Sequence, residues 1–131
     1  MREKAQRRNL DWIIESAGTA GYHQGQSPDH RSILVAKQNN IDISGQFARQ
    51  FKPSDFESFD YILTMDAQNY QDIKRIALEG RENQIELILN YLYPGQNRAV
   101  PDPYYGGAQG FENVYELLDK ACDAFIKKVL E

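Results

Sequence analysis

Three runs of β-branched, aromatic and other apolar residues alternate with helix-type patterns, and this alternation most strongly constrains the fold. The runs are residues 10–16, 59–65 and 85–89. Each has the length and composition of a buried strand. Strands that alternate with helices form right-handed βαβ units, so the pattern predicts a parallel sheet covered by helices on both faces.

The helical segments are marked by start signals and by apolar spacing. Ser27 and Pro28 read as the N-cap and first position of one helix, and Asp66 reads as the cap of a second, over residues 67–80. Residues 1–9 are good helix formers without a start signal. The most regular pattern lies in residues 111–129, where apolar side chains recur at i, i+3 and i+4: Val114, Leu117, Leu118, Ala121, Cys122, Phe125, Ile126 and Val129.

Length and charge exclude several classes of protein. At 131 residues, 41% hydrophobic and 26% charged, the chain predicts a single folded domain over residues 1–131. The net charge of −4 argues against a nucleic-acid partner, and the basic residues near the start read as a solvated helix face. No run approaches a membrane span or a secretory signal, so we expect no membrane partner and a cytoplasmic location.

The sequence has too few cysteines for an internal disulfide and too few cysteines and histidines for a structural metal site. The sequence holds one cysteine, Cys122, which permits no internal disulfide, and its two histidines do not complete a zinc set. We therefore expect no metal. Cys122 lies on the apolar stripe of the last predicted helix, which is typical of a buried structural thiol.

Three polar side chains directly follow predicted strands. Ser16 ends the first, Asp66 follows the second, and Asp102 lies in the long loop after the third. In an open parallel sheet, ligands bind beyond the carboxyl ends of the strands. The topology therefore predicts that these three residues share one rim. The alternative for Ser16 is a strand-end hydroxyl, and for Asp66 a helix cap only.

The Asp102 loop is unusual in its residue types. Pro101 and Pro103 remove two backbone donors and favour an extended conformation at Asp102, so the acid is held on a stiff arm. Tyr104 and Tyr105 add two flat rings, and Gly106-Gly107 permits a sharp turn. This suits an aromatic ligand whose leaving oxygen needs a proton. The alternative is a proline-rich turn with Asp in its usual role there.

Five segments in order resemble the low-molecular-weight protein tyrosine phosphatases. They are Ser16-Ala17-Gly18-Thr19, then Tyr22-His23 with Gly25 and Ser27-Pro28-Asp29, then Ala48-Arg49-Gln50, then Phe59-Asp60-Tyr61-Ile62-Leu63 with Met65-Asp66, and finally Asp102-Pro103-Tyr104-Tyr105-Gly106. Ordered matches with compatible spacing are far more specific than any single motif.

The resemblance implies a fold and an activity. The fold is a three-layer α/β/α sandwich with a four-stranded parallel sheet, of flavodoxin-like phosphatase I topology. The activity is hydrolysis of phosphotyrosine, in a protein or a small aryl phosphate, through a cysteinyl-phosphate intermediate and without a cofactor.

The resemblance also implies a role for individual residues. Asp102 protonates the leaving phenolic oxygen and then activates water. Tyr22, Tyr104 and Tyr105 form the slot for the ring. Ser16 braces the phosphate loop, and Asp66 helps to hold the arginine of that loop.

Two departures from the family pattern affect these expectations. Ser44-Gly45-Gln46-Phe47 stands where many relatives carry a histidine, and no Cys-x5-Arg phosphate loop occurs in the 131 residues. We therefore expect a chain that begins after the family's first strand, which is central in the sheet, and after the phosphate loop and the start of the first helix. Such a chain would be inactive alone, and partly folded or self-associated through its incomplete sheet.

Two other functions share the same residues. A non-catalytic pseudophosphatase would bind phosphotyrosine through the aromatic slot, although Asp102 is not needed for binding alone. An arsenate-reductase-like enzyme would need further cysteines beside Cys122.

Overall fold

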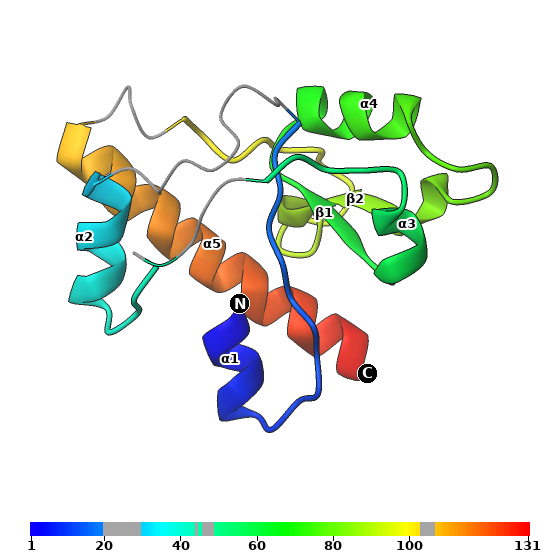
Figure 1. The fold of residues 1–131 in the computed structure, drawn as a ribbon. Coiled ribbons are helices and arrows are strands. Elements are labelled where there is room, and N and C mark those ends of the chain that lie inside the picture. Colours follow the sequence, from blue (N-terminus) through cyan, green and yellow to red (C-terminus); the bar gives the residue numbers. More distant parts are fainter. Residues whose placement is uncertain (20–29, 44, 46–48, 103–106) are drawn as a thin grey trace.

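The computed structural model describes residues 1–19, 30–43, 45, 49–102 and 107–131 (Figure 1). Its elements, in order, are α1 (Arg2–Arg7), α2 (His30–Gln38), α3 (Asp55–Ser58), β1 (Ile62–Thr64), α4 (Ala67–Arg75), the 3-10 turn η2 (Glu82–Gln84), β2 (Ile85–Leu87), the 3-10 turn η3 (Ile88–Asn90) and α5 (Gly107–Leu130).

The predicted parallel sheet is confirmed in two of its strands. β1 and β2 pair in parallel, with Ile62 opposite Ile85 and Thr64 opposite Leu87. Both alternate buried and half-buried side chains, and both are shorter than the apolar runs that predicted them. The hydroxyl of Thr64 donates to the carbonyl of Glu86 at 3.1 Å, which ties the two strands further. The chain has an α/β fold.

The strand predicted over residues 10–16 is wrong for this structure. Residues 10–17 have no regular secondary structure, and the segment makes only one parallel bridge, between Gly18 and Gln50. A strand is defined by its ladder, and an extended segment without a neighbour has none. Instead the Gly18 amide donates to the carbonyl of Arg49, and the Phe51 amide to the carbonyl of Gly18, both at 2.8 Å.

α5 confirms the helix predicted from spacing and carries much of the core. Ala121 and Cys122 pack with Ile88 and Leu89 of η3. Phe125 makes T-shaped contacts with three rings, with centroids at 6.0 Å for Trp12, 5.3 Å for Tyr61 and 4.9 Å for Tyr91. A second cluster, between the sheet and α3 and α4, contains Phe56, Ile62, Ile73 and Ile85. The helical stripe therefore buries its apolar face as expected.

α1 confirms a short helix near the start of the chain. Lys4 joins it to α5 through two salt bridges of 2.9 Å, to Asp119 and Asp123. Burial opposes the charge on Lys4, but the hydrogen bonds to the two carboxylates outweigh it and raise the pKa of the amine.

α4 begins where the sequence indicated and ends sooner. The carboxylate of Asp66 accepts a hydrogen bond of 2.7 Å from the amide of Asn69, so the predicted cap is confirmed. The helix ends at Arg75 rather than near Gly80, because Ala77 and Leu78 leave it to pack against the Phe56 cluster. No helix in the described residues is long and apolar enough to cross a membrane.

Candidate functional site

A broad groove separates residues 11–19 from β1. Its volume is about 1670 Å³, and residues 11–19 line one wall while residues 58–65 line the other. In Figure 1 the extended segment (blue) and β1 both run toward the start of α4. The end of the blue segment lies beside α4, the helix that follows β1, because Thr19 lines a small cavity with Asp72 and Ile73.

Asp102 lies on an arm anchored at the end of β1. The amide of Val100 donates to the carbonyl of Met65 at 2.8 Å, and the Val100 side chain packs against the Ile88–Cys122 cluster. Asp102, two residues further, is exposed. The hydrogen bond from Val100 to Met65 thus ties the loop after β2 to the end of β1. Tyr104 and Tyr105, proposed as ring contacts, lie outside the described residues.

Ser16 and the end of β1 share the groove. Ser16 is exposed and lines the groove, as do Met65 and Asn69. The backbone amide of Asn69 donates a hydrogen bond to the carboxylate of Asp66. Ser16 and the Met65–Asn69 turn thus line the same groove, and the Asp102 arm is bonded to that turn through Val100. The bracing role of Ser16 and the arginine-holding role of Asp66 stay predictions.

Arg49 and Asp55 form an ion pair that sequence reasoning did not single out as a site feature. The guanidinium donates to both carboxylate oxygens, Nη1 to Oδ2 at 3.0 Å and Nη2 to Oδ1 at 3.2 Å. Glu15, in the extended wall, approaches Arg49 at 3.6 Å. The pair joins the extended wall to α3. Only the Ala48-Arg49-Gln50 segment, noted for its resemblance, pointed toward it.

Cys122 is not placed as an exposed nucleophile. Its side chain is buried in α5, and burial raises the pKa of its thiol above the usual range despite the nearby amino group of Met1 and the Lys4 ammonium. A thiolate attacks, so a raised pKa makes the sulfur less reactive at neutral pH. The prediction of a buried structural thiol is confirmed.

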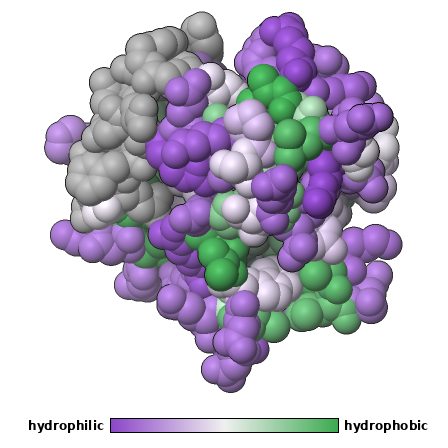
Figure 2. All heavy atoms as spheres, turned by 45° about the vertical axis from the view of Figure 1, so that its right-hand side comes forward, coloured by the Kyte–Doolittle hydropathy of each residue, from purple (hydrophilic) through white to green (hydrophobic). Residues whose placement is uncertain are grey.

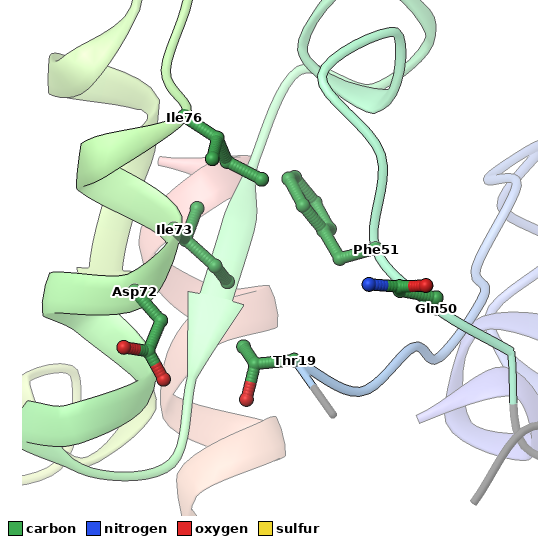
Figure 3. A pocket seen from close by; sticks show the side chains of 6 residues that line it. All are labelled: Thr19, Gln50, Phe51, Asp72, Ile73 and Ile76. Atoms are coloured by element: carbon green, nitrogen blue, oxygen red, sulfur yellow. The ribbon is translucent and has the colours of Figure 1, made fainter. Parts of the chain in front are cut away.

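A small cavity lies where the extended wall reaches α4. Figure 3 shows Thr19 facing Asp72 and Ile73 of α4, with Phe51 and Ile76 beside them and Gln50 at the edge. Its volume is about 140 Å³, enough for a few water molecules. It places Thr19 beside α4, three residues before Tyr22, which lies outside the described residues.

Of the Ser44–Phe47 segment, which departs from the family pattern, the structure describes Gly45 alone. Among the described residues, no three His, Cys, Asp or Glu side chains are grouped to hold a metal ion.

Comparisons with known proteins agree on one family. The model of the family described as low molecular weight phosphotyrosine protein phosphatase matches residues 1–131. The phosphatase of that name from Schizosaccharomyces pombe is 39% identical over 116 residues, covering 88% of this chain and 74% of that protein. Its human counterpart is 38% identical over 120 residues, covering 90% and 75%.

A solved structure shows the same similarity in three dimensions. The protein tyrosine phosphatase from Entamoeba histolytica, crystallised with Hepes in its active site, superposes with a TM-score of 0.89 at 35% identity. The match covers 98% of this chain and 83% of that one.

Proposed function

We propose that this chain takes part in phosphotyrosine hydrolysis with Asp102 as the general acid. The chain belongs to the low molecular weight phosphotyrosine protein phosphatase family, whose members hydrolyse phosphoric monoesters. The substrate class is a phosphotyrosine protein or a small aryl phosphate.

The anchored position of Asp102 is the observation that carries the proposal. The bond from Val100 to Met65 holds the arm at the carboxyl end of β1, and the two prolines limit its conformations. A phenol has a pKa near 10, so its departure as an anion at neutral pH is costly. An acid on a fixed arm can donate a proton to the leaving oxygen, an effect of roughly 10²–10⁴-fold in rate.

Nucleophilic attack needs a thiol that Cys122 does not supply. In the proposed reaction a thiolate sulfur bonds to phosphorus as the phenolic oxygen leaves with the proton of Asp102. Water activated by Asp102 then releases phosphate from the sulfur. Because the one cysteine of the sequence is buried in α5, we expect no turnover of p-nitrophenyl phosphate by the 131 residues alone.

The test uses the chain fused to a strand and Cys-x5-Arg segment at its start. We expect the fusion to hydrolyse p-nitrophenyl phosphate, and Asp102→Asn in the fusion to lower kcat by roughly 10²–10⁴-fold. Glu79→Gln, also at an exposed carboxylate but in the turn after α4, is the control and should keep its activity. Equal activity of Asp102→Asn and the parent fusion would refute the role of Asp102.

A non-catalytic binder is the second candidate, because the exposed arm and the aromatic residues after it suit ring binding without a thiol. Fluorescence titration of the 131-residue chain with phosphotyrosine tests it. Saturable binding, together with an inactive fusion, would favour the binder over the phosphatase. An arsenate-reductase-like enzyme would need further cysteines beside Cys122, so that alternative has no support.

Self-association through the incomplete sheet is a further proposal about partners. It is supported by β1, whose residues line the groove and which, among the described residues, pairs with β2 alone. Sedimentation at increasing concentration should show a rising mass, whereas a constant monomer mass would contradict it. A cytoplasmic location and a single domain over residues 1–131 stay predictions of the sequence.

A further inference from the structure

We propose that Asn90 and Asn97 are positioning residues for Asp102, because hydrogen bonds between the two asparagines hold the loop that carries the acid. The inference rests on the proposed function, since it explains how the general acid of that reaction is kept in place. Both asparagines act through the backbone of the loop and not on the substrate itself.

Two hydrogen bonds close the loop between Asn90 and Asn97. The backbone amide of Asn97 donates to the side-chain carbonyl of Asn90 at 2.9 Å. The side-chain amide of Asn90 donates to the side-chain carbonyl of Asn97 at 3.0 Å. These bonds join residues seven positions apart in the chain. We call the two residues the asparagine pair.

The asparagine pair is bonded to the sheet through Asn90. The side-chain amide of Asn90 also donates to Oε1 of Glu86 at 2.8 Å, and the same oxygen accepts from the backbone amide of Leu87 at 2.8 Å. Glu86 is the middle residue of β2, and Leu89, directly before Asn90, is 2% exposed. Asn90 therefore has a fixed place relative to the sheet.

Polar contacts hold the exposed part of this loop. Residues 94–99 are exposed, so burial contributes little to their position. On the face drawn in Figure 2, hydrophilic residues (purple) likewise separate patches of hydrophobic ones (green). Asn97 has a φ of 53°, in the left-handed region that asparagine adopts more readily than most residues. Next to it, the Arg98 guanidinium lies 4.2 Å from the centre of the Tyr93 ring.

Asn97 is the first of two anchors on the way to Asp102. Three residues further, the amide of Val100 donates to the carbonyl of Met65 at 2.8 Å. One anchor fixes a point of the chain and leaves its direction open, whereas two anchors at most roughly 11 Å apart fix both. Pro101 then restricts the backbone before Asp102. The asparagine pair therefore sets the direction in which the loop presents the acid.

Loss of the asparagine pair should impair proton donation more than nucleophilic attack. A displacement of about 1 Å in a reacting group can cost roughly 10²-fold in rate. Phenol has a pKa near 10, so it leaves poorly without a proton. p-Nitrophenol leaves more easily, because its nitro group spreads the negative charge of the anion. Hydrolysis of phenyl phosphate should therefore fall more than hydrolysis of p-nitrophenyl phosphate.

The test compares kcat/KM for these two substrates in the fusion that carries the Cys-x5-Arg segment. Asn90→Ala removes both bonds of the pair, and should lower kcat/KM at least about tenfold for phenyl phosphate and at most about threefold for p-nitrophenyl phosphate. Partial unfolding lowers both values by one factor, so their ratio does not depend on the folded fraction. Asn83→Ala, at an exposed asparagine in η2 before β2, is the control and should keep both values within about twofold.

Two variants at Asn97 separate the hydrogen bond from the backbone conformation. Asn97→Gly keeps access to a positive φ but removes the side-chain oxygen, and should change the ratio in the same direction as Asn90→Ala. Asn97→Asp keeps an oxygen that accepts from Asn90 and should keep the parent ratio within about twofold. Amide exchange at Val100 requires no turnover and should be at least about tenfold faster in Asn90→Ala than in the parent fusion.

The outcomes distinguish this inference from the proposed function. An unchanged substrate ratio in Asp102→Asn would refute the role of Asp102 itself. A changed ratio in Asp102→Asn, together with the parent ratio in Asn90→Ala, would overturn the positioning role alone. An equal loss for both substrates in Asn90→Ala, or unchanged exchange at Val100, would overturn it as well. A fusion without turnover would contradict the proposed function, and exchange at Val100 would still decide whether the asparagine pair holds the loop.

Discussion

The Arg49–Asp55 ion pair allows a stability prediction whose size follows from its geometry. Asp55 is only 7% exposed and accepts three hydrogen bonds, two from the Arg49 guanidinium and one of 2.8 Å from the Lys52 amide. Asp55→Asn removes the charge and leaves Arg49 facing one carbonyl oxygen instead of a carboxylate. The guanidinium would then be without its main partner.

The expected loss is about 2 kcal/mol. Breaking a buried ion pair costs roughly 3–5 kcal/mol, and hydrogen bonds to charged groups contribute roughly 1.5–3 kcal/mol. The Arg49 side chain is 31% exposed, so water recovers part of its solvation and the lower end applies. With an unfolding entropy of roughly 2.1 cal/mol/K per residue, 131 residues would lose about 7 °C in Tm.

The pH dependence gives a second test of the same pair. Burial acts to raise the pKa of Asp55, but the hydrogen bond from Arg49 and the other partners outweigh it and lower the pKa below its usual value. The stabilisation is therefore complete above the unfolded pKa near 3.9 and is lost as pH falls through the lower folded pKa. The difference between the parent and Asp55→Asn should accordingly shrink in acid.

Thermal unfolding at pH 7 and below pH 4 measures the loss of stability and its pH dependence. Amide exchange at Gly18 and Phe51 reports whether the groove wall formed by residues 11–19 stays bonded to residues 49–51. Glu57→Gln is the matched control, an exposed carboxylate two residues along α3. A loss under about 0.5 kcal/mol for Asp55→Asn, or a loss that stays constant from pH 7 into acid, would show that the pair contributes no more than an ordinary surface bridge.

Three other predictions concern Gln84, Asp66 and Cys122. Gln84→Ala removes an amide that donates to Phe59 at 2.7 Å, Phe56 at 3.2 Å and Asp60 at 3.3 Å, and should cost about 1–3 kcal/mol in urea unfolding; exposed Asn83→Ala should cost little. Asp66→Ala should cost about 1 kcal/mol through the lost cap. Asp66→Asn should restore stability, so an activity loss that persists in the fusion would indicate a second role. Cys122 should react with iodoacetamide far more slowly in the native chain than in urea, and fast native labelling would contradict its burial.

The sequence by itself determined the elements whose signals are local. The apolar spacing of residues 111–129 predicted α5, and Asp66 predicted the start of α4, because a helix satisfies its hydrogen bonds within its own segment. The alternation of strand-type and helix-type runs was enough to predict a parallel sheet, and the Asp102 motif pointed to its rim.

Only the tertiary structure decided which extended runs become strands. Residues 10–16 and 59–65 have similar composition, yet only the second has a ladder partner, because β2 lies beside it. The bond from Val100 to Met65 and the pairing of Arg49 with Asp55 likewise depend on where separate segments meet. Strand pairing and ion pairs are made between segments, so local composition can propose a partner but the folded chain has to provide it.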